Sequence, residues 1–273
     1  MKKKAIISCG VLYGEVNKLA RSRDDWNVEF LPQGLHDKPD SSDMRRRIQD
    51  KIDDLESKSN YDQIVLGYGF CGGGVEGLST SGAKLIVPKM HDCIPLLAGN
   101  KNLKGNMAEP GTYYLSRGWI DCSSDAYKEH LFFSNQLENW RNRFLDYKNE
   151  LTNSIMANNI GWWFNQDRLD PEKRGRERFD RETSKKITLQ CIGNYRTLAL
   201  IENSLLETIH ADYADEMYKF LSKLLSEAGR GDIEFKRLSS SLNPLREVLF
   251  QPESSGLTHI QPCNEPLELE SKI

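Results

Sequence analysis

The sequence lacks the local motifs that most often reveal a function. Its six cysteines include no pair spaced as CxxC, so no zinc or redox motif is complete within one segment. The glycine-rich stretch 67–74 has no P-loop lysine at the required place and does not complete a dinucleotide-binding fingerprint. A nucleotide cofactor is therefore not expected.

Two further absences concern the setting of the protein. No apolar run approaches the roughly 20 residues that a membrane helix needs, and the apolar segment behind Lys2–Lys4 is too short for a signal peptide. The net charge of −3 gives no electrostatic reason to bind nucleic acid or an anionic membrane. We therefore expect a cytoplasmic protein that handles a small molecule and keeps its cysteines as thiols or ligands.

The sequence does contain an alternation of apolar strands and amphipathic helices. This alternation predicts an α/β fold: two Rossmann-like parallel-sheet units joined by a helical segment. Strands are predicted at 4–8, 27–31, 63–67, 83–88, 111–116, 196–201, 232–238 and 247–250. Helices are predicted at 11–20, 43–57, 75–82, 94–99, 127–158 and 213–228.

A change of composition after residue 123 suggests the domain boundaries. We expect a first α/β unit at 1–123, a helical segment with a charged insertion at 124–186, a second α/β unit at 187–260 and a tail at 261–273. The charges of 165–186 nearly balance, which is typical of a solvated surface. The chain from Pro252 onward is rich in serine, proline and glutamate, and we expect it to be loose.

Three cysteines and a histidine each follow a predicted strand closely. Cys9 ends the first strand, Cys71 sits among the glycines after the third, and His91 and Cys93 follow the fourth. Because the carboxyl ends of parallel strands form one edge of a sheet, and ligands bind there, these side chains should come together. The glycines would expose Cys71 towards the other two cysteines.

Three chemistries suit such a cluster. Three thiolates can hold an iron–sulfur cluster that keeps one iron open. Three cysteines and His91 can hold zinc tetrahedrally. Two cysteines alone can act as a facing acid and base on a small acid, as amino-acid racemases do. Asp92 could orient His91 in any of these arrangements.

Other candidates for contact with a ligand are less specific. Gly72 and Gly73 permit close approach of the backbone. Tyr113 and Tyr114 could wall a pocket, although aromatic strand residues are more often core. His36 lies in a proline-bounded loop, where it is either an ordinary loop residue or a ligand.

Several short motifs stand out along the chain. They are Cys9-Gly10-Val11-Leu12, the loop from Leu35-His36 to Pro39, Tyr68-Gly69-Phe70-Cys71-Gly72-Gly73-Gly74, Val87-Pro88 with His91-Asp92-Cys93-Ile94, and Gly111-Thr112-Tyr113-Tyr114-Leu115 with Gly118-Trp119. Together these motifs resemble a known family, the domain of unknown function (DUF) 1638 family of bacteria and archaea. The resemblance extends from Lys4 to about Ile260 and is most specific in the first half.

The resemblance implies an association rather than an activity. Members of that family often look like neighbours of corrinoid-dependent methyltransferase systems, which implies a methyl-transfer or accessory role beside a corrinoid protein or methyltransferase. The leading hypothesis is a metal or iron–sulfur site at Cys9, Cys71 and Cys93, with His91 nearby, serving small-molecule or one-carbon chemistry. The alternatives are a cofactor-independent two-cysteine enzyme and a non-catalytic partner protein, so whether the protein is an enzyme stays open.

Overall fold

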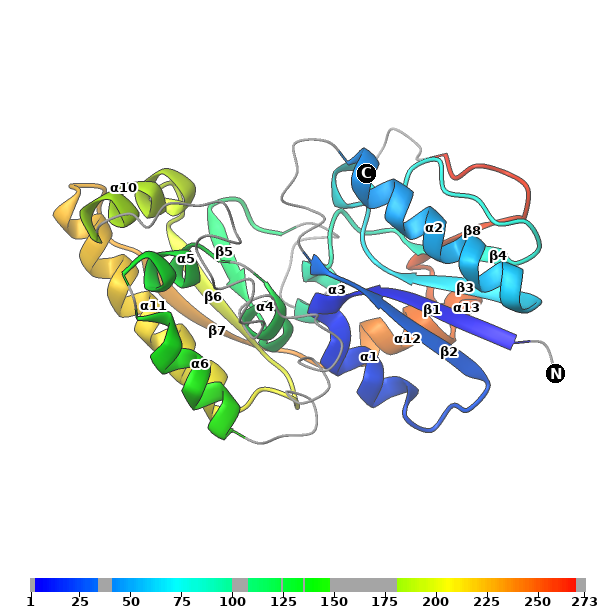
Figure 1. Ribbon diagram of the computed structural model, residues 1–273, viewed down its shortest axis with the longest axis horizontal. Helices are drawn as coiled ribbons and strands as arrows, with labels where there is room; N and C mark the ends of the chain where they lie inside the picture. The colour runs from blue at the N-terminus through cyan, green and yellow to red at the C-terminus, as the bar shows by residue number, and fades with distance from the viewer. Residues whose placement is uncertain are drawn as a thin grey trace. The chain divides into compact units, whose positions relative to one another are not determined.

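The computed structural model describes residues 3–33, 41–99, 108–123, 125–134, 136–147 and 181–268. The chain forms two compact units, which we call unit 1 (Met1–Glu109 with Ser240–Ile273) and unit 2 (Pro110–Ser239). Each unit has its own sheet of mainly parallel strands with helices between them, so the predicted Rossmann-like α/β fold is confirmed (Figure 1).

Unit 1 is built on a five-stranded sheet in the order β2-β1-β3-β4-β8. The first four strands run parallel, and β8 pairs antiparallel with β4. Ala5, Ile6 and Ile7 are fully buried, as expected for a parallel strand covered on both faces. The strands are β1 (Lys3–Cys9), β2 (Trp26–Leu31), β3 (Tyr61–Gly67), β4 (Lys84–Pro88) and β8 (Thr258–Gln261).

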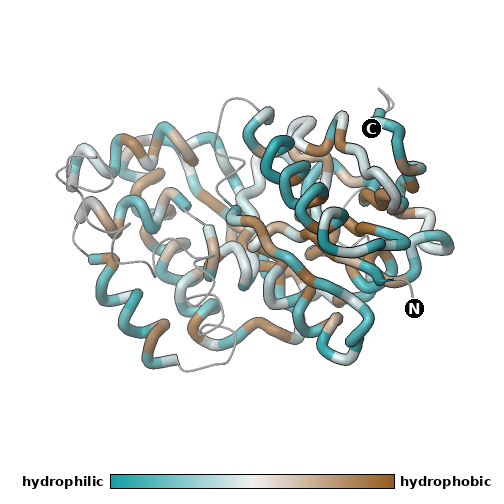
Figure 2. The backbone as a smooth tube through the Cα atoms, turned by 45° about the vertical axis from the view of Figure 1, so that its right-hand side comes forward, coloured by the Kyte–Doolittle hydropathy of each residue, from teal (hydrophilic) through white to brown (hydrophobic). Residues whose placement is uncertain are grey.

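The helices of unit 1 cover this sheet through their apolar faces. The longest, α2 (Ser42–Lys58), buries Met44, Ile48, Ile52 and Leu55, which recur at three- and four-residue spacing on one face. Figure 2 shows hydrophilic and hydrophobic residues alternating along the helices. The other helices are η1 (Gly10–Leu12), α1 (Tyr13–Ala20), η3 (Cys71–Gly73), α3 (Ile94–Ala98), α12 (Asn243–Phe250) and α13 (Pro252–Ser255).

Unit 2 has a three-stranded parallel sheet in the order β5-β6-β7. Its central strand is fully buried from Leu198 to Leu200. The strands are β5 (Thr112–Leu115), β6 (Thr197–Glu202) and β7 (Glu234–Ser239). The helices are α4 (Arg117–Cys122), α5 (Ala126–Phe133), α6 (Leu137–Asp146), α10 (Arg181–Ile192) and α11 (Thr208–Glu227).

The structure divides the chain differently from the boundaries expected at 123, 186 and 260. The fifth strand, β5, pairs with β6 and so belongs to unit 2. The chain after residue 239 returns to unit 1, where β8 extends the first sheet and α12 contacts β3 and α3. Strand pairing between distant segments decides this division, and composition along the chain does not reveal it.

Three local predictions are wrong. Residues 247–250 were expected as a strand but lie in α12, where Leu245, Val248 and Leu249 form a buried helical face. The segment 75–82 forms turns rather than a helix. The chain from Pro252, expected to be loose, contains α13 and β8.

Some predictions fall on parts of the chain that are not described. They are His36 with its loop, residues 148–158 of the expected long helix, residues 165–180 of the charged stretch and the end of the tail at 269–273. Among the residues that the structure describes, no helix is long and apolar enough to cross a membrane.

Candidate functional site at the carboxyl edge of the first sheet

The three predicted cysteines lie at one edge of the unit 1 sheet. Strands β1, β3 and β4 are neighbours and run parallel, so their carboxyl ends meet at the same edge. Cys9 is the last residue of β1, Cys71 follows β3 after one short turn, and Cys93 precedes α3, which follows β4. We call these residues, together with Tyr68, the cysteine edge.

Backbone contacts hold the loops after β3 and β4 against each other. The Phe70 N–H donates to the Met90 carbonyl at 2.8 Å, and the Cys71 N–H donates to the His91 carbonyl at 2.9 Å. Gly69 makes this approach possible, because a Cβ there would lie 2.4 Å from the Asp92 Cα, far inside contact distance. The glycine turn thus fixes Cys71 beside the loop that carries Cys93.

The backbone of Cys71 is strained. Its φ is +47°, and the φ angles of Gly72 and Gly73 are +66° and +84°. A non-glycine residue in this left-handed region costs about 1–2 kcal/mol, and such strain concentrates at functional sites. The Arg45 Nη2 donates to the Gly73 carbonyl at 3.0 Å and helps to hold the turn from α2.

The three thiols interact electrostatically. Burial raises the pKa of Cys9 to about 11, against a hydrogen bond from the Val11 N–H that lowers it. Burial, then the nearby Cys9 and Asp92, raise the pKa of Cys71, while the Gly69 N–H lowers it. Burial, Cys9, Cys71 and Asp92 likewise raise the pKa of Cys93. The cysteines therefore lie near one another, and without a bound cation they are protonated thiols at neutral pH.

The Tyr68 side chain interacts electrostatically with these three thiols. Its side chain is 1% exposed, and its hydroxyl has no hydrogen-bond partner among the residues that the structure describes. Burial, and then charge on Cys9, Cys71 and Cys93, raise the pKa of Tyr68 well above its ordinary value. Sequence reasoning missed this residue, although it stands in the same glycine-rich motif as Cys71.

His91 and Asp92 immediately precede Cys93 in the loop after β4, and His91 is exposed whereas Asp92 is half-buried. The His91 side chain is 55% exposed, and its Nδ1 lies 3.4 Å from Asp92 Oδ2. Asp92 Oδ1 accepts a hydrogen bond of 2.8 Å from the Ile94 N–H at the start of α3. Asp92 therefore contacts the His91 ring, and the imidazole is much more open to solvent than the buried Cys9.

The structure does not group every candidate with the cysteine edge. Tyr113 and Tyr114 belong to unit 2, where Tyr114 is core and Tyr113 packs edge-on against Tyr195. Gly72 is exposed and Gly73 is half-buried in the turn itself. The remaining cysteines are Cys122 and Cys191 in unit 2 and Cys263 in unit 1.

The side chains as they lie do not form a one-ion site. The described part of the chain contains no group of three or more His, Cys, Asp or Glu residues that could hold a metal ion. Tetrahedral zinc with Zn–S bonds of about 2.3 Å would bring its thiolates within about 4 Å of one another. A cluster of several irons takes one thiolate at each of separate irons, so it needs wider spacing. The donors at the cysteine edge are sulfurs, the kind of ligand that soft metals and iron–sulfur clusters prefer.

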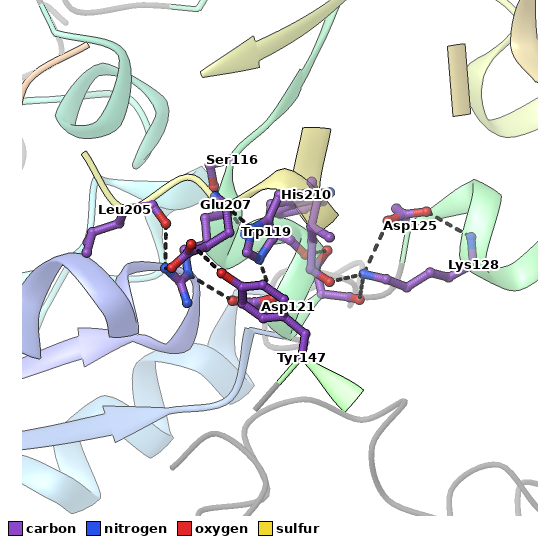
Figure 3. Close-up of polar contacts among 12 residues, drawn as sticks. Ser116, Trp119, Asp121, Asp125, Lys128, Tyr147, Leu205, Glu207 and His210 are labelled. Carbon is purple, nitrogen blue, oxygen red and sulfur yellow. Dashed lines mark hydrogen bonds and ion pairs between the residues drawn. The ribbon is translucent and has the colours of Figure 1, made fainter. Parts of the chain in front are cut away.

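A second polar cluster lies in unit 2 and was missed by the sequence analysis (Figure 3). Asp121 of α4 lies 2.9 Å from His210 Nε2 and 3.4 Å from Arg117 Nε. Arg117 also lies 3.2 Å from Glu207 and donates to the Leu205 carbonyl. We call these residues, with Asp125, Lys128, Tyr147 and Tyr213, the unit 2 network.

The contacts of His210 indicate a structural role. The Glu207 N–H donates to His210 Nδ1 at 3.2 Å, so Nδ1 is the acceptor and Nε2 carries the proton that it donates to Asp121. Burial by itself would raise the pKa of Asp121, but His210, Arg117 and Lys128 together lower it. Both ring nitrogens are used, which leaves neither for a substrate.

Lys128 is paired in the same manner. It is fully buried, its Nζ donates to the Ser123 carbonyl at 3.0 Å, and it lies 3.3 Å from Asp125. Asp125 also accepts from the Tyr213 hydroxyl at 2.9 Å. Burial lowers the pKa of Lys128, and the attraction of Asp125 opposes this. The network ties α4 and α5 to α11, and the Arg117–Asp121 spacing of four residues was its one visible sign in the sequence.

The fold and the cysteine edge define a class of protein: a Rossmann-like α/β protein with three cysteines at the carboxyl edge of a parallel sheet. The chain belongs to the family described as "Protein of unknown function (DUF1638)", whose model matches residues 30–238, and the predicted resemblance is therefore confirmed. The matched span includes Cys71, His91 and Cys93, while Cys9 precedes it. No curated protein and no solved structure matches the chain.

Proposed function

We propose that the protein binds an iron–sulfur cluster through Cys9, Cys71 and Cys93 and leaves one iron open to a small molecule. The observation that carries this proposal is that three cysteines lie at one sheet edge, where they interact electrostatically with a buried tyrosine hydroxyl that no described residue pairs. Three thiolates leave one position of a four-iron cluster without a protein ligand. His91 is the nearby candidate for an interchangeable fourth ligand.

Backbone N–H groups directed at the sulfurs support the proposal. Val11 donates to Cys9 and Gly69 donates to Cys71, and each of these hydrogen bonds favours the thiolate. Hydrogen bonds to sulfur are among the means by which a protein stabilises and tunes a cluster. A bound cationic group would also reverse the raised pKa values, because it favours the deprotonated ligands.

The alternative hypothesis, a cofactor-independent enzyme that uses two cysteines as acid and base, is less well supported than the iron–sulfur cluster. It requires one thiolate at neutral pH to act as a base, yet the pKa values of Cys9, Cys71 and Cys93 are all raised. It also leaves the third cysteine without a role. It predicts a metal-free enzyme that stoichiometric alkylation of one thiol inactivates.

The family resemblance suggests the setting of the site. Association with corrinoid-dependent methyltransferase systems favours a role in one-carbon chemistry, with a corrinoid protein or methyltransferase as partner. An open iron would let the protein act on a small molecule in that setting. A stable complex with a corrinoid protein, without turnover of any candidate substrate, would instead favour a non-catalytic partner protein.

The test is the metal content of the protein purified without oxygen. We expect iron and acid-labile sulfide in stoichiometric amount, with broad visible absorption that reduction bleaches. Cys9→Ser, Cys71→Ser and Cys93→Ser should each lose most of the iron. Cys122→Ser and Cys263→Ser are matched controls, one buried and one half-buried, and should retain it.

Three results would contradict the proposal. A wild type that takes up no iron, even after reconstitution with iron and sulfide, would remove its basis. Stoichiometric zinc without sulfide would replace the cluster with a Cys₃His site. Equal iron loss in the control variants would show that the three cysteines are not special.

A further inference from the structure

Tyr68 is a buried residue of the cysteine edge whose hydroxyl has no evident structural role. The side chain is 1% exposed, and no described residue pairs with its hydroxyl. A buried hydroxyl without a partner destabilises a folded protein, so native structures rarely keep one without a reason. Phenylalanine would fill the same space without that cost.

The place of Tyr68 in the sheet gives such a reason. It directly follows β3, which lies between β1, the strand of Cys9, and β4, the strand that leads to Cys93. The backbone bonds from Phe70 and Cys71 to the 90–91 segment close the two loops on either side of it. The hydroxyl is buried at this edge of the sheet, close enough to Cys9, Cys71 and Cys93 to interact electrostatically with each of them.

We propose that the Tyr68 hydroxyl donates a hydrogen bond to the group held by Cys9, Cys71 and Cys93, either to a cluster sulfur or to a ligand on its open iron. This inference rests on the proposed function. A phenol is a donor at neutral pH, and sulfide, thiolate and metal-bound oxygen all accept. Tyr68 is therefore a positioning residue that tunes the bound group.

The hydrogen bond has a measurable consequence for the reduction potential. Reduction adds negative charge to a cluster, so a hydrogen-bond donor stabilises the reduced form more than the oxidised form. Removing the donor should therefore make the potential more negative. A purely structural tyrosine would leave the potential unchanged.

The chain offers a matched control in Tyr61, the first residue of β3. Tyr61 is also buried, but its hydroxyl accepts from Asn27 Nδ2 at 3.2 Å at the opposite end of the strand. Tyr61→Phe removes a hydroxyl from the same strand without approaching the cysteines. It separates an effect of the cysteine edge from a general loss of stability.

The experiment compares wild type, Tyr68→Phe and Tyr61→Phe after anaerobic reconstitution with iron and sulfide. Iron content and melting temperature are measured with and without the cluster, and the midpoint potential by reductive titration. For Tyr68→Phe we expect an unchanged or higher melting temperature of the iron-free protein, and a smaller rise on loading. We expect its midpoint potential to fall by about 30–60 mV, a three- to tenfold change in the one-electron equilibrium.

The outcomes separate the two proposals. A Tyr68→Phe variant that keeps its iron-free stability but fails to hold iron also supports the hydrogen bond, because the hydroxyl then contributes to retention. A Tyr68→Phe protein with wild-type iron content, potential and loading response overturns this inference alone. An equal shift in Tyr61→Phe does so too. A wild type that takes up no iron overturns both proposals.

Discussion

The unit 2 network and the cysteine edge of unit 1 treat their buried polar groups differently. In unit 2, Asp121 pairs with both Arg117 and His210, and Lys128 pairs with Asp125. In unit 1, the Tyr68 hydroxyl has no partner among the described residues, and burial keeps the nearby thiols protonated. A buried network stabilises a fold when its polar groups form hydrogen bonds and ion pairs with one another. An unpaired hydroxyl beside free thiols is instead suited to hydrogen-bond to a ligand that the thiols bind.

Among the substitutions that test this comparison, Asp121→Ala in unit 2 should have the largest effect on stability. Removing this carboxylate leaves the buried His210 Nε2–H without its acceptor and leaves Arg117 with only Glu207 and the Leu205 carbonyl. The loss of this buried anion should cost about 3–5 kcal/mol in the free energy of unfolding. Urea denaturation followed by circular dichroism measures the loss. The protein that remains folded should still bind iron, so a loss of iron in step with the loss of stability in Asp121→Ala would break the separation between the two regions.

The pH dependence of the iron-free protein tests the thiols. A folded-state pKa of about 11 for Cys9, raised from an ordinary 9.0, means that folded protein binds more protons than unfolded protein between those values. Stability is thus retained below about pH 9 and lost as the pH rises through 11, on the order of 2–3 kcal/mol from Cys9 alone.

Two comparisons sharpen that measurement. Cys9→Ala should remove part of the alkaline loss, because alanine does not titrate. The cluster-loaded protein should lack it, since its ligands are already deprotonated. An iron-loaded wild type with the same alkaline profile as the iron-free protein would argue against ligation by Cys9.

The smallest expected change in stability comes from Gly69→Ala. The new Cβ would lie 2.4 Å from the Asp92 backbone, so the loops after β3 and β4 must separate. We expect a loss of about 1–3 kcal/mol by thermal or urea unfolding, together with a much larger loss of iron. Gly72→Ala is the control, because its Cβ meets open space and only the φ of +66° is unfavourable. Retention of iron by Gly69→Ala would show that loop contact is not required.

Much of the fold could be predicted from the sequence. The apolar runs at β1, β3, β4 and β6 are short and bounded by turns, and their residues are buried as expected. The prediction was wrong at 247–250, because a short apolar run fits both a strand and a helix. It also missed the return of the C-terminal segment to unit 1, which depends on the pairing of β8 with β4.

The candidate site was only partly visible in the sequence. Cys9, Cys71 and Cys93 could be named because each follows a predicted strand. Tyr68 could not, because a buried tyrosine is ordinary until its hydroxyl is seen to lack a partner. In the unit 2 network Asp121 contacts His210, which is distant in the chain, so no local pattern predicts that contact.

The sequence by itself determined the class of fold, the family and which three cysteines closely follow a strand. Each of these depends on local periodicity or on position next to a strand, and both can be recognised in a short segment of the chain. The tertiary structure alone decided which strands share a sheet and which polar groups are satisfied. It set the strained backbone of Cys71, the close approach of Gly69 to Asp92, and the burial of the Tyr68 side chain. These features arise from contacts between distant segments, and such contacts exist only once the chain has folded.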